Sequence, residues 1–150
     1  MSAGQRQVAG LLALALACAA AAQTSAVVAY QVNGDGIDEP LAAASGDAVR
    51  GRELVGNRQT GLCLLCHSGP FEPRHLQGDL APSLDGVGAR YTAAQLRLRI
   101  VNSQRLTPGS VMPAYHHVTG LTRVGRAWQG QPVFDARQVE DVVAYLVTLR

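Results

Sequence analysis

The most reactive side chains in this sequence are two cysteines and a histidine, Cys63, Cys66 and His67. Two cysteines three positions apart, followed at once by a histidine, form the attachment pattern of c-type haem. Because residues three apart lie on one side of a helical turn, both thiols can reach the vinyl groups of one porphyrin and form thioethers. The motif predicts one covalently bound haem c, with the imidazole as an iron ligand and a second axial position to be filled.

The second axial ligand is expected to be Met112. It is the only methionine besides the initiator, and it lies in the Pro- and Gly-rich stretch 108–115, where a methionine that packs in a core would be unusual. A methionine that fills a gap beside a turn is the alternative. His75 could bind the iron instead, as could one of His116 and His117, but adjacent histidines point in different directions, so at most one of that pair could do so.

Pro82 lies in a turn-rich strip that follows the motif. Its carbonyl is a natural acceptor for the other ring nitrogen of an iron-bound histidine, and such a bond would fix the ring and raise its basicity. The predicted cofactor-binding residues are therefore Cys63, Cys66, His67, Met112 and Pro82, of which His67 and Met112 would bind the metal. None of them is expected to be catalytic.

Two other chemistries would use the same cysteines. Cys63 and Cys66 could bind a structural zinc ion together with two of the four histidines of the chain. The adjacent His67 and the lone internal Met112 would then be coincidences. A thiol redox motif agrees less well with the sequence around the two cysteines, because no strand–helix–strand pattern surrounds them.

The helix expected just before the motif covers residues 48–56. Asp47 can cap its N-terminus, and the helix ends before Asn57. Gly51 lies inside it, where a glycine costs about 1 kcal/mol relative to alanine. A close crossing with another helix would explain this residue, since a missing side chain lets a neighbouring backbone approach; a merely tolerated glycine is the alternative.

Two further helices are predicted from capping boxes. Thr92 and Gln95 begin one that runs to about Val101, although the alternation over residues 96–100 is also compatible with a strand. Asp135 and Gln138 begin another, whose apolar residues repeat at helical spacing to the end of the chain.

The first 26 residues have the zones of a secretory signal peptide: Arg6, then an apolar run, then small residues. The run is too short and too rich in alanine for a stable membrane span. Cleavage after Ala22 or Ala26 would remove Cys18. The alternative is that a lipid anchor is attached at Cys18. Residues 27–45 mix glycine, proline and acidic positions without a helical period and are predicted to form an extended N-terminal arm.

The net charge of the chain and the number of its free thiols limit the possible functions. The formal net charge is +2 and becomes nearly neutral without the signal peptide, so nucleic acid is a poor candidate partner. Arg97, Arg99 and Arg105 could pair with haem propionates or with a partner, but at least two of them are expected on a solvated helix face. Once Cys63 and Cys66 are thioethers, no thiol remains for sulfur or acyl transfer.

The order of these features resembles a class I cytochrome c. The resemblance covers the Gly51 helix, the Cys63 to His67 motif, the Pro82 turn, the Met112 loop and a C-terminal helix that carries Tyr145. It implies an all-α fold in which three to four helices and long loops surround one covalently bound haem, and a cytochrome c domain over residues 46–150.

Four stretches, residues 86–92, 95–99, 112–115 and 139–146, look more narrowly like the SoxX subunit of the SoxAX cytochromes of thiosulfate oxidation. That resemblance implies a periplasmic heterodimer with a SoxA-like haem subunit. There thiosulfate is joined oxidatively to a cysteine of the SoxYZ carrier, and the electrons pass to a soluble cytochrome c. This chain would be the electron-transfer subunit of an L-cysteine S-thiosulfotransferase, not catalytic alone. A free-standing periplasmic cytochrome c shuttle is the alternative.

Overall fold

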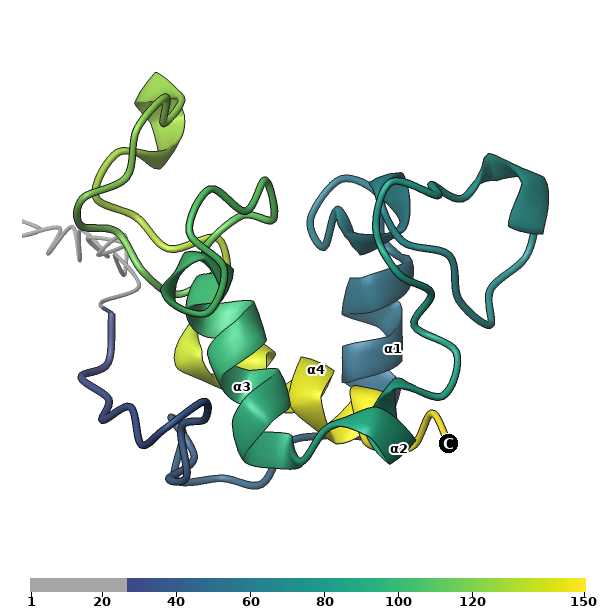
Figure 1. Cartoon of the computed structure of the whole chain (residues 1–150), viewed down its shortest axis with the longest axis horizontal. Coiled ribbons are helices and arrows are strands. Elements are labelled where there is room, and N and C mark those ends of the chain that lie inside the picture. Colours follow the sequence, from purple (N-terminus) through teal and green to yellow (C-terminus); the bar gives the residue numbers. More distant parts are fainter. Residues whose placement is uncertain (1–26) are drawn as a thin grey trace, which may run out of the picture.

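The computed structural model describes residues 27–150, so the predicted signal peptide and Cys18 lie outside the described residues. Over this range the chain forms helices joined by long loops, and it has no β-sheet, only one isolated bridge between Asn33 and Gly36 (Figure 1). The all-α prediction is confirmed for this part of the chain. The α-helices are α1 (Ala48–Gly56), α2 (Val87–Arg90), α3 (Ala93–Asn102) and α4 (Ala136–Leu146), and the short 3-10 turns are η1 (Cys63–Leu65), η2 (Arg74–Leu76), η3 (Ser103–Arg105) and η4 (Arg126–Trp128).

The N-termini of α1, α3 and α4 follow from local capping chemistry. Asp47 accepts hydrogen bonds from the backbone N–H groups of Val49 at 2.8 Å and Arg50 at 3.1 Å. Thr92 and Asp135 each form a complete capping box with the glutamine three positions later. These side chains satisfy amide groups that have no partner inside the helix, so the three predicted starts are confirmed.

The end of α4 differs from the prediction. The helix stops at Leu146 and does not continue to the end of the chain. The last residues tighten into a turn, and the carbonyl of Leu149 then accepts a hydrogen bond from the N–H of Gly88 at 2.8 Å. This contact with α2 requires the backbone to leave the helical path.

Helices α1 and α4 cross at very close range, as the glycine in α1 suggested. A side chain at Gly51 would overlap the carbonyl oxygen of Asp141 and lie 2.9 Å from Cβ of Tyr145. The crossing therefore excludes even a methyl group. Arg50 fixes the same crossing from its flank, because its guanidinium forms an ion pair with Asp141 at 2.7 Å.

Arg97 has a role that the sequence did not indicate. It is 5% exposed, and its guanidinium makes two hydrogen bonds to the carboxylate of Glu140, at 2.7 and 2.9 Å. Of the three arginines considered for a solvated face, a haem propionate or a partner, Arg97 therefore has none of these roles, because α4 supplies a buried carboxylate. Arg99 is half-buried with its guanidinium 3.9 Å from the ring centroid of Tyr91, and Arg105 is exposed.

Residues 27–47 contain no helix and lie against α3 and α4 (Figure 1). Ile37 is 1% exposed and donates its N–H to the carbonyl of Ala94 at 3.0 Å. Arg97 donates to the carbonyl of Ile37 at 2.6 Å, and Glu140 accepts the N–H of Leu41 at 2.9 Å. The buried ion pair thus also fixes this segment, which is packed onto the helices and does not project from them.

Within the described residues, no helix combines the length and the apolar character needed to cross a membrane.

Candidate functional site

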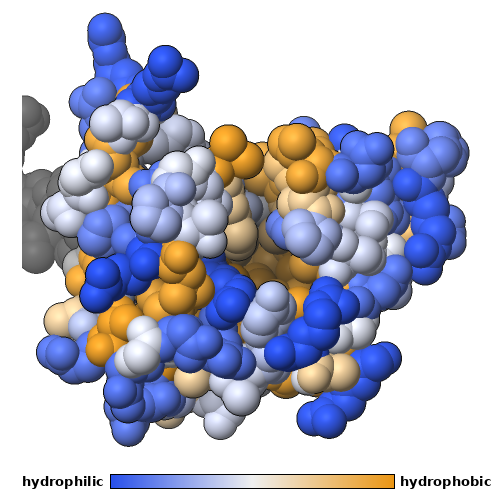
Figure 2. Space-filling view, viewed as in Figure 1, coloured by the Kyte–Doolittle hydropathy of each residue, from blue (hydrophilic) through white to orange (hydrophobic). Residues whose placement is uncertain are grey.

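An apolar crevice lies between the turn that carries the cysteines and the loop that carries Met112. It consists of two adjoining hollows of about 230 and 370 Å³ that share wall residues from both sides, among them His67, Leu84, Ile100 and Met112. Hydrophobic side chains surround the hollow at the centre of the face shown in Figure 2. Helix α4 contributes Val142 and Leu146 to the same wall. The crevice is therefore built by segments that lie between Val55 and Leu146 in the sequence.

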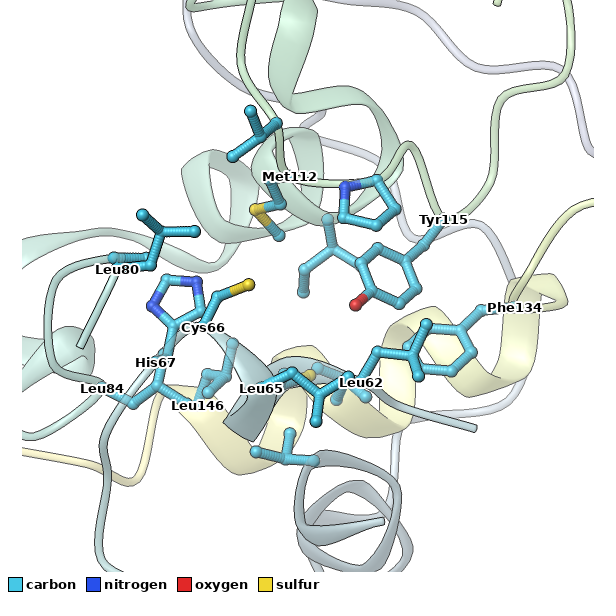
Figure 3. A pocket seen from close by; sticks show the side chains of 17 residues that line it. Leu62, Leu65, Cys66, His67, Leu80, Leu84, Met112, Tyr115, Phe134 and Leu146 are labelled. Atoms are coloured by element: carbon cyan, nitrogen blue, oxygen red, sulfur yellow. The ribbon is translucent and has the colours of Figure 1, made fainter. Parts of the chain in front are cut away.

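His67 projects into the crevice with one ring nitrogen already engaged (Figure 3). Its Nδ1 lies 2.6 Å from the carbonyl oxygen of Pro82, the contact expected from the sequence. A carbonyl can only accept, so Nδ1 carries the proton and donates it, which leaves Nε2 with a free lone pair. This is the tautomer and orientation that a metal-binding imidazole requires.

Cys63 and Cys66 lie at the start of this same segment. Cys63 begins η1, and the N–H groups of Cys66 and His67 both donate to its carbonyl oxygen, at 3.2 and 2.9 Å. The expected helical turn is a short 3-10 helix, and it directs both cysteines and the histidine to one crevice. Neither cysteine forms a disulfide. Burial raises the pKa of the Cys63 thiol to about 11, so this sulfur stays protonated.

Met112 comes from the opposite wall, and its sulfur points into the crevice (Figure 3). Two serines hold its backbone. Ser103 donates its hydroxyl to the carbonyl of Met112 at 3.0 Å, and Ser110 accepts the N–H of Met112 at 3.3 Å. Neither serine could be identified from the sequence, because nothing in their spacing distinguishes them from ordinary loop residues.

Tyr115 was also missed, and it joins the two walls. Its hydroxyl donates to the carbonyl of Gly61 at 2.6 Å, and its ring packs against Phe134 with centroids 4.6 Å apart. It is 3% exposed, and burial raises the pKa of its phenol well above the usual range. The only signal in the sequence was its position three residues after Met112.

The alternative histidine ligands lie outside the crevice walls. Both nitrogens of the fully buried His116 are engaged: Nδ1 lies 2.8 Å from the carbonyl oxygen of Phe134, and Nε2 accepts the N–H of Val28 at 3.0 Å. His117 contacts the hydroxyl of Tyr30, and His75 is exposed on η2. Among residues 27–150, no three side chains of the His, Cys, Asp and Glu types converge to hold a metal ion, so the zinc alternative gains no support.

The residues around the crevice fit haem c. Two thiols that can form thioethers, an imidazole with a free Nε2 and a thioether sulfur all border one apolar cavity. Apolar walls suit a flat, largely hydrophobic macrocycle, and nitrogen and sulfur are the axial donors of many cytochromes c. The fold and the site together define an all-helical domain with the donor set of a c-type cytochrome.

Comparison with solved structures gives a more specific relationship. The chain is similar to the crystal structure of SoxXA from P. pantotrophus, with 33% sequence identity and a TM-score of 0.74, over 84% of this chain and 98% of that chain. No family model matches the chain, and neither does any curated protein. At this identity and coverage the chain belongs to the SoxX family, which confirms the resemblance found in the sequence.

Proposed function

We propose that this protein is the monohaem cytochrome c subunit of a SoxAX-type complex and transfers electrons during thiosulfate oxidation. The observation that supports this most strongly is the convergence of His67 and Met112, from opposite walls, on the apolar crevice that also receives Cys63 and Cys66. When bound, haem c would supply a centre that accepts and releases one electron at a time.

Each residue of the site has a distinct role in this proposal. Cys63 and Cys66 hold the porphyrin through thioethers, and His67, oriented by Pro82, provides the imidazole ligand. Met112 provides the sulfur ligand. With both axial positions filled by the chain, no position is open for a small-molecule substrate, which favours electron transfer over catalysis at the metal.

The surroundings of the crevice agree with this role. The wall side chains are almost all apolar, so they keep water away from the site and favour a rigid, poorly solvated environment. At the mouth, Leu65, Leu80 and Val111 are 45%, 73% and 80% exposed. Apolar side chains that are exposed together around a binding site mark a surface that a partner protein covers.

The partner assignments extend the proposal. The similar structure is of SoxXA, and we propose a corresponding heterodimer of this chain with a SoxA-like haem subunit in the periplasm, after removal of residues 1–26. Once the two cysteines are thioethers, the mature chain has no thiol, so the coupling of thiosulfate to a SoxYZ cysteine would belong to the partner. This chain would be the electron-transfer subunit of the L-cysteine S-thiosulfotransferase and would pass electrons to a soluble cytochrome c.

The class I cytochrome c fold over residues 46–150 is part of the same proposal.

The first experiment tests the cofactor. The chain is expressed with haem-maturation machinery and then extracted with acidified organic solvent. We expect visible absorption bands that stay with the wild-type polypeptide, and a mass increase of one haem. In the Cys63→Ala/Cys66→Ala variant, any haem should be removed by extraction. A wild-type protein that is colourless, or that loses its colour on extraction, would refute the proposal.

The second experiment separates the proposed subunit from a free-standing shuttle. Thiosulfate-dependent reduction of a soluble cytochrome c is measured with purified SoxYZ, with this protein, and with or without a SoxA-type haem subunit. We expect turnover only when both haem subunits are present. A matured protein that forms no complex with the SoxA-type subunit and adds nothing to turnover would favour the shuttle.

A further inference from the structure

The loop of residues 118–131, here called the Arg–Trp loop, projects from the molecule at the upper left of Figure 1. Buried residues hold both of its ends. His116 is fully buried on the N-terminal side, and Phe134, 1% exposed, donates its N–H to the carbonyl of Tyr115 at 2.8 Å on the C-terminal side. The loop therefore presents its side chains from a fixed base.

The tip of the Arg–Trp loop carries an exposed aromatic side chain. Trp128, at the end of η4, is 50% exposed. Together with Val118, Leu121 and Val124 it lines a shallow hollow of about 360 Å³. A tryptophan beside a partly apolar hollow is typical of the centre of a protein interface, where such a ring is covered by the partner.

The same loop carries positive charge that the described part of the chain does not pair with a carboxylate. Arg123 and Arg126 are both exposed, and among the described residues no carboxylate lies within ion-pair distance of either. Arg123 has a left-handed backbone with φ of 58°, a conformation that a glycine would adopt more easily. An arginine is present there in spite of this conformational cost.

The charge of the surrounding sequence has the same sign. No aspartate or glutamate occurs between Asp85 and Asp135. That stretch contains the arginines at positions 90, 97, 99, 105, 123 and 126. Only Arg97 among them forms an ion pair within the described part of the chain. A binding surface formed from this region would attract a surface of negative charge.

We propose that the Arg–Trp loop docks onto an acidic patch of a partner protein, with Arg123 and Arg126 binding carboxylates and Trp128 covered by the partner surface. The inference rests on the proposed function, because it takes the SoxA-like haem subunit as that partner. Arginine and tryptophan are the residue types that most often dominate binding energy at interfaces, and arginine forms bidentate contacts with carboxylates.

A protein partner agrees with this loop better than a membrane or a nucleic acid. Recognition of anionic lipid typically uses four to eight basic residues or an amphipathic helix, whereas the loop has two arginines and one short 3-10 turn. Nucleic acids require a more extensive positive surface than a chain of net charge +2 provides.

The test uses the matured full-length protein and a purified SoxA-type haem subunit, with affinity measured by isothermal titration calorimetry. Two variants change the loop: Arg123→Glu/Arg126→Glu, and Trp128→Ala. The control is Arg74→Glu, an exposed arginine on η2, at the opposite side of the molecule (Figure 1). Unchanged visible and circular dichroism spectra of each variant confirm that the fold is intact.

We expect each loop variant to bind the haem subunit about tenfold or more weakly than wild type, and the control to bind within about twofold. Wild-type affinity should decrease when the ionic strength is raised from about 0.01 to 0.15 M, because the screening length then shortens from about 30 to 8 Å. The double charge reversal should make the affinity depend less on ionic strength. Equal affinities of wild type and loop variants would overturn the docking assignment alone.

Two other results would also decide the matter. If the wild-type protein does not bind the haem subunit at all, both the partner proposal and this assignment fail. If the loop variants bind the subunit normally but lose binding to vesicles that contain anionic lipid, the surface is a membrane contact and the protein assignment is wrong.

Discussion

The hydroxyl of Tyr115 lies 2.6 Å from the carbonyl oxygen of Gly61 and donates a hydrogen bond to it across the crevice. Gly61 is two residues before Cys63, and Tyr115 is three residues after Met112. This single bond therefore connects the segment that carries the thiols to the segment that carries the sulfur ligand. The close packing of Phe134 on the tyrosine ring keeps the hydroxyl directed at its acceptor.

Removal of this bond should weaken the fold. We expect Tyr115→Phe to lower the free energy of unfolding by about 1–3 kcal/mol, because the carbonyl of Gly61 loses its hydroxyl donor in a buried site. Urea denaturation of the matured protein measures the change. Tyr91→Phe is the control, since the half-buried ring stays in place beside Arg99. Equal stability losses in the two variants would show that the Tyr115 bond has no special contribution.

Met112 should control the coordination of the bound group. We expect Met112→Ala to remove the weak long-wavelength absorption of sulfur-ligated ferric haem and to let the reduced protein bind carbon monoxide, since one axial position is then open. Absorption spectra of both oxidation states measure this. Val111→Ala, at the exposed neighbour, should leave both properties unchanged. Retention of the band in Met112→Ala would reassign the ligand.

The helix crossing at Gly51 reverses the usual effect of alanine in a helix. Elsewhere Gly→Ala in a helix stabilises by about 1 kcal/mol. Here the added methyl group overlaps the carbonyl of Asp141, so we expect Gly51→Ala to cost about 1–3 kcal/mol, as overpacked cores do. Thermal and urea unfolding measure the sign. Gly125→Ala, where the new methyl group would be 3.8 Å from Trp128, should change stability by less than about 0.5 kcal/mol.

Asp141 makes the stability of the fold depend on pH. Burial alone would raise the pKa of its carboxyl, but hydrogen bonds from the Arg50 guanidinium and the N–H of Asp47 outweigh burial and hold the pKa below the usual aspartate range. The unfolded chain therefore takes up a proton at a higher pH than the folded protein. The stabilisation is fully present above about pH 5 and is lost as the pH falls through the folded pKa.

The matched variants isolate this effect. We expect Asp141→Asn to be less stable than wild type at neutral pH and the difference to shrink as the pH is lowered from about 5 to 2. Asp79→Asn, at an exposed carboxylate, should follow the wild-type curve. Denaturant unfolding across the pH range tests this. A difference between wild type and Asp141→Asn that is independent of pH would contradict the assignment.

Local chemistry made much of the fold predictable. Asp47, Thr92 and Asp135 cap helices through bonds to residues two or three positions away, so a short window of sequence contains both partners. The cost of Gly51 within a helix similarly indicated a close crossing with another helix. The contact between His67 and Pro82 was inferred from the chemistry of the imidazole.

Other features depend on residues far apart in the sequence. The buried role of Arg97 was not foreseen, because its partner Glu140 is 43 positions away and alternation within α3 contains no information about that carboxylate. Tyr115 and Ser103 were overlooked for the same reason. Their acceptors are backbone carbonyls, of Gly61 and of Met112, and a backbone group has no signature in a sequence.

The contacts of Glu140 also affect the order in which the protein can be completed. The segment around Ile37 and Leu41 is synthesised early, yet the carboxylate that holds it belongs to α4, the last helix of the described chain. Helix α4 also supplies Val142 and Leu146 to the crevice wall. A truncated chain that ended before Ala136 would therefore lack both a closed crevice wall and the carboxylate that anchors the early segment.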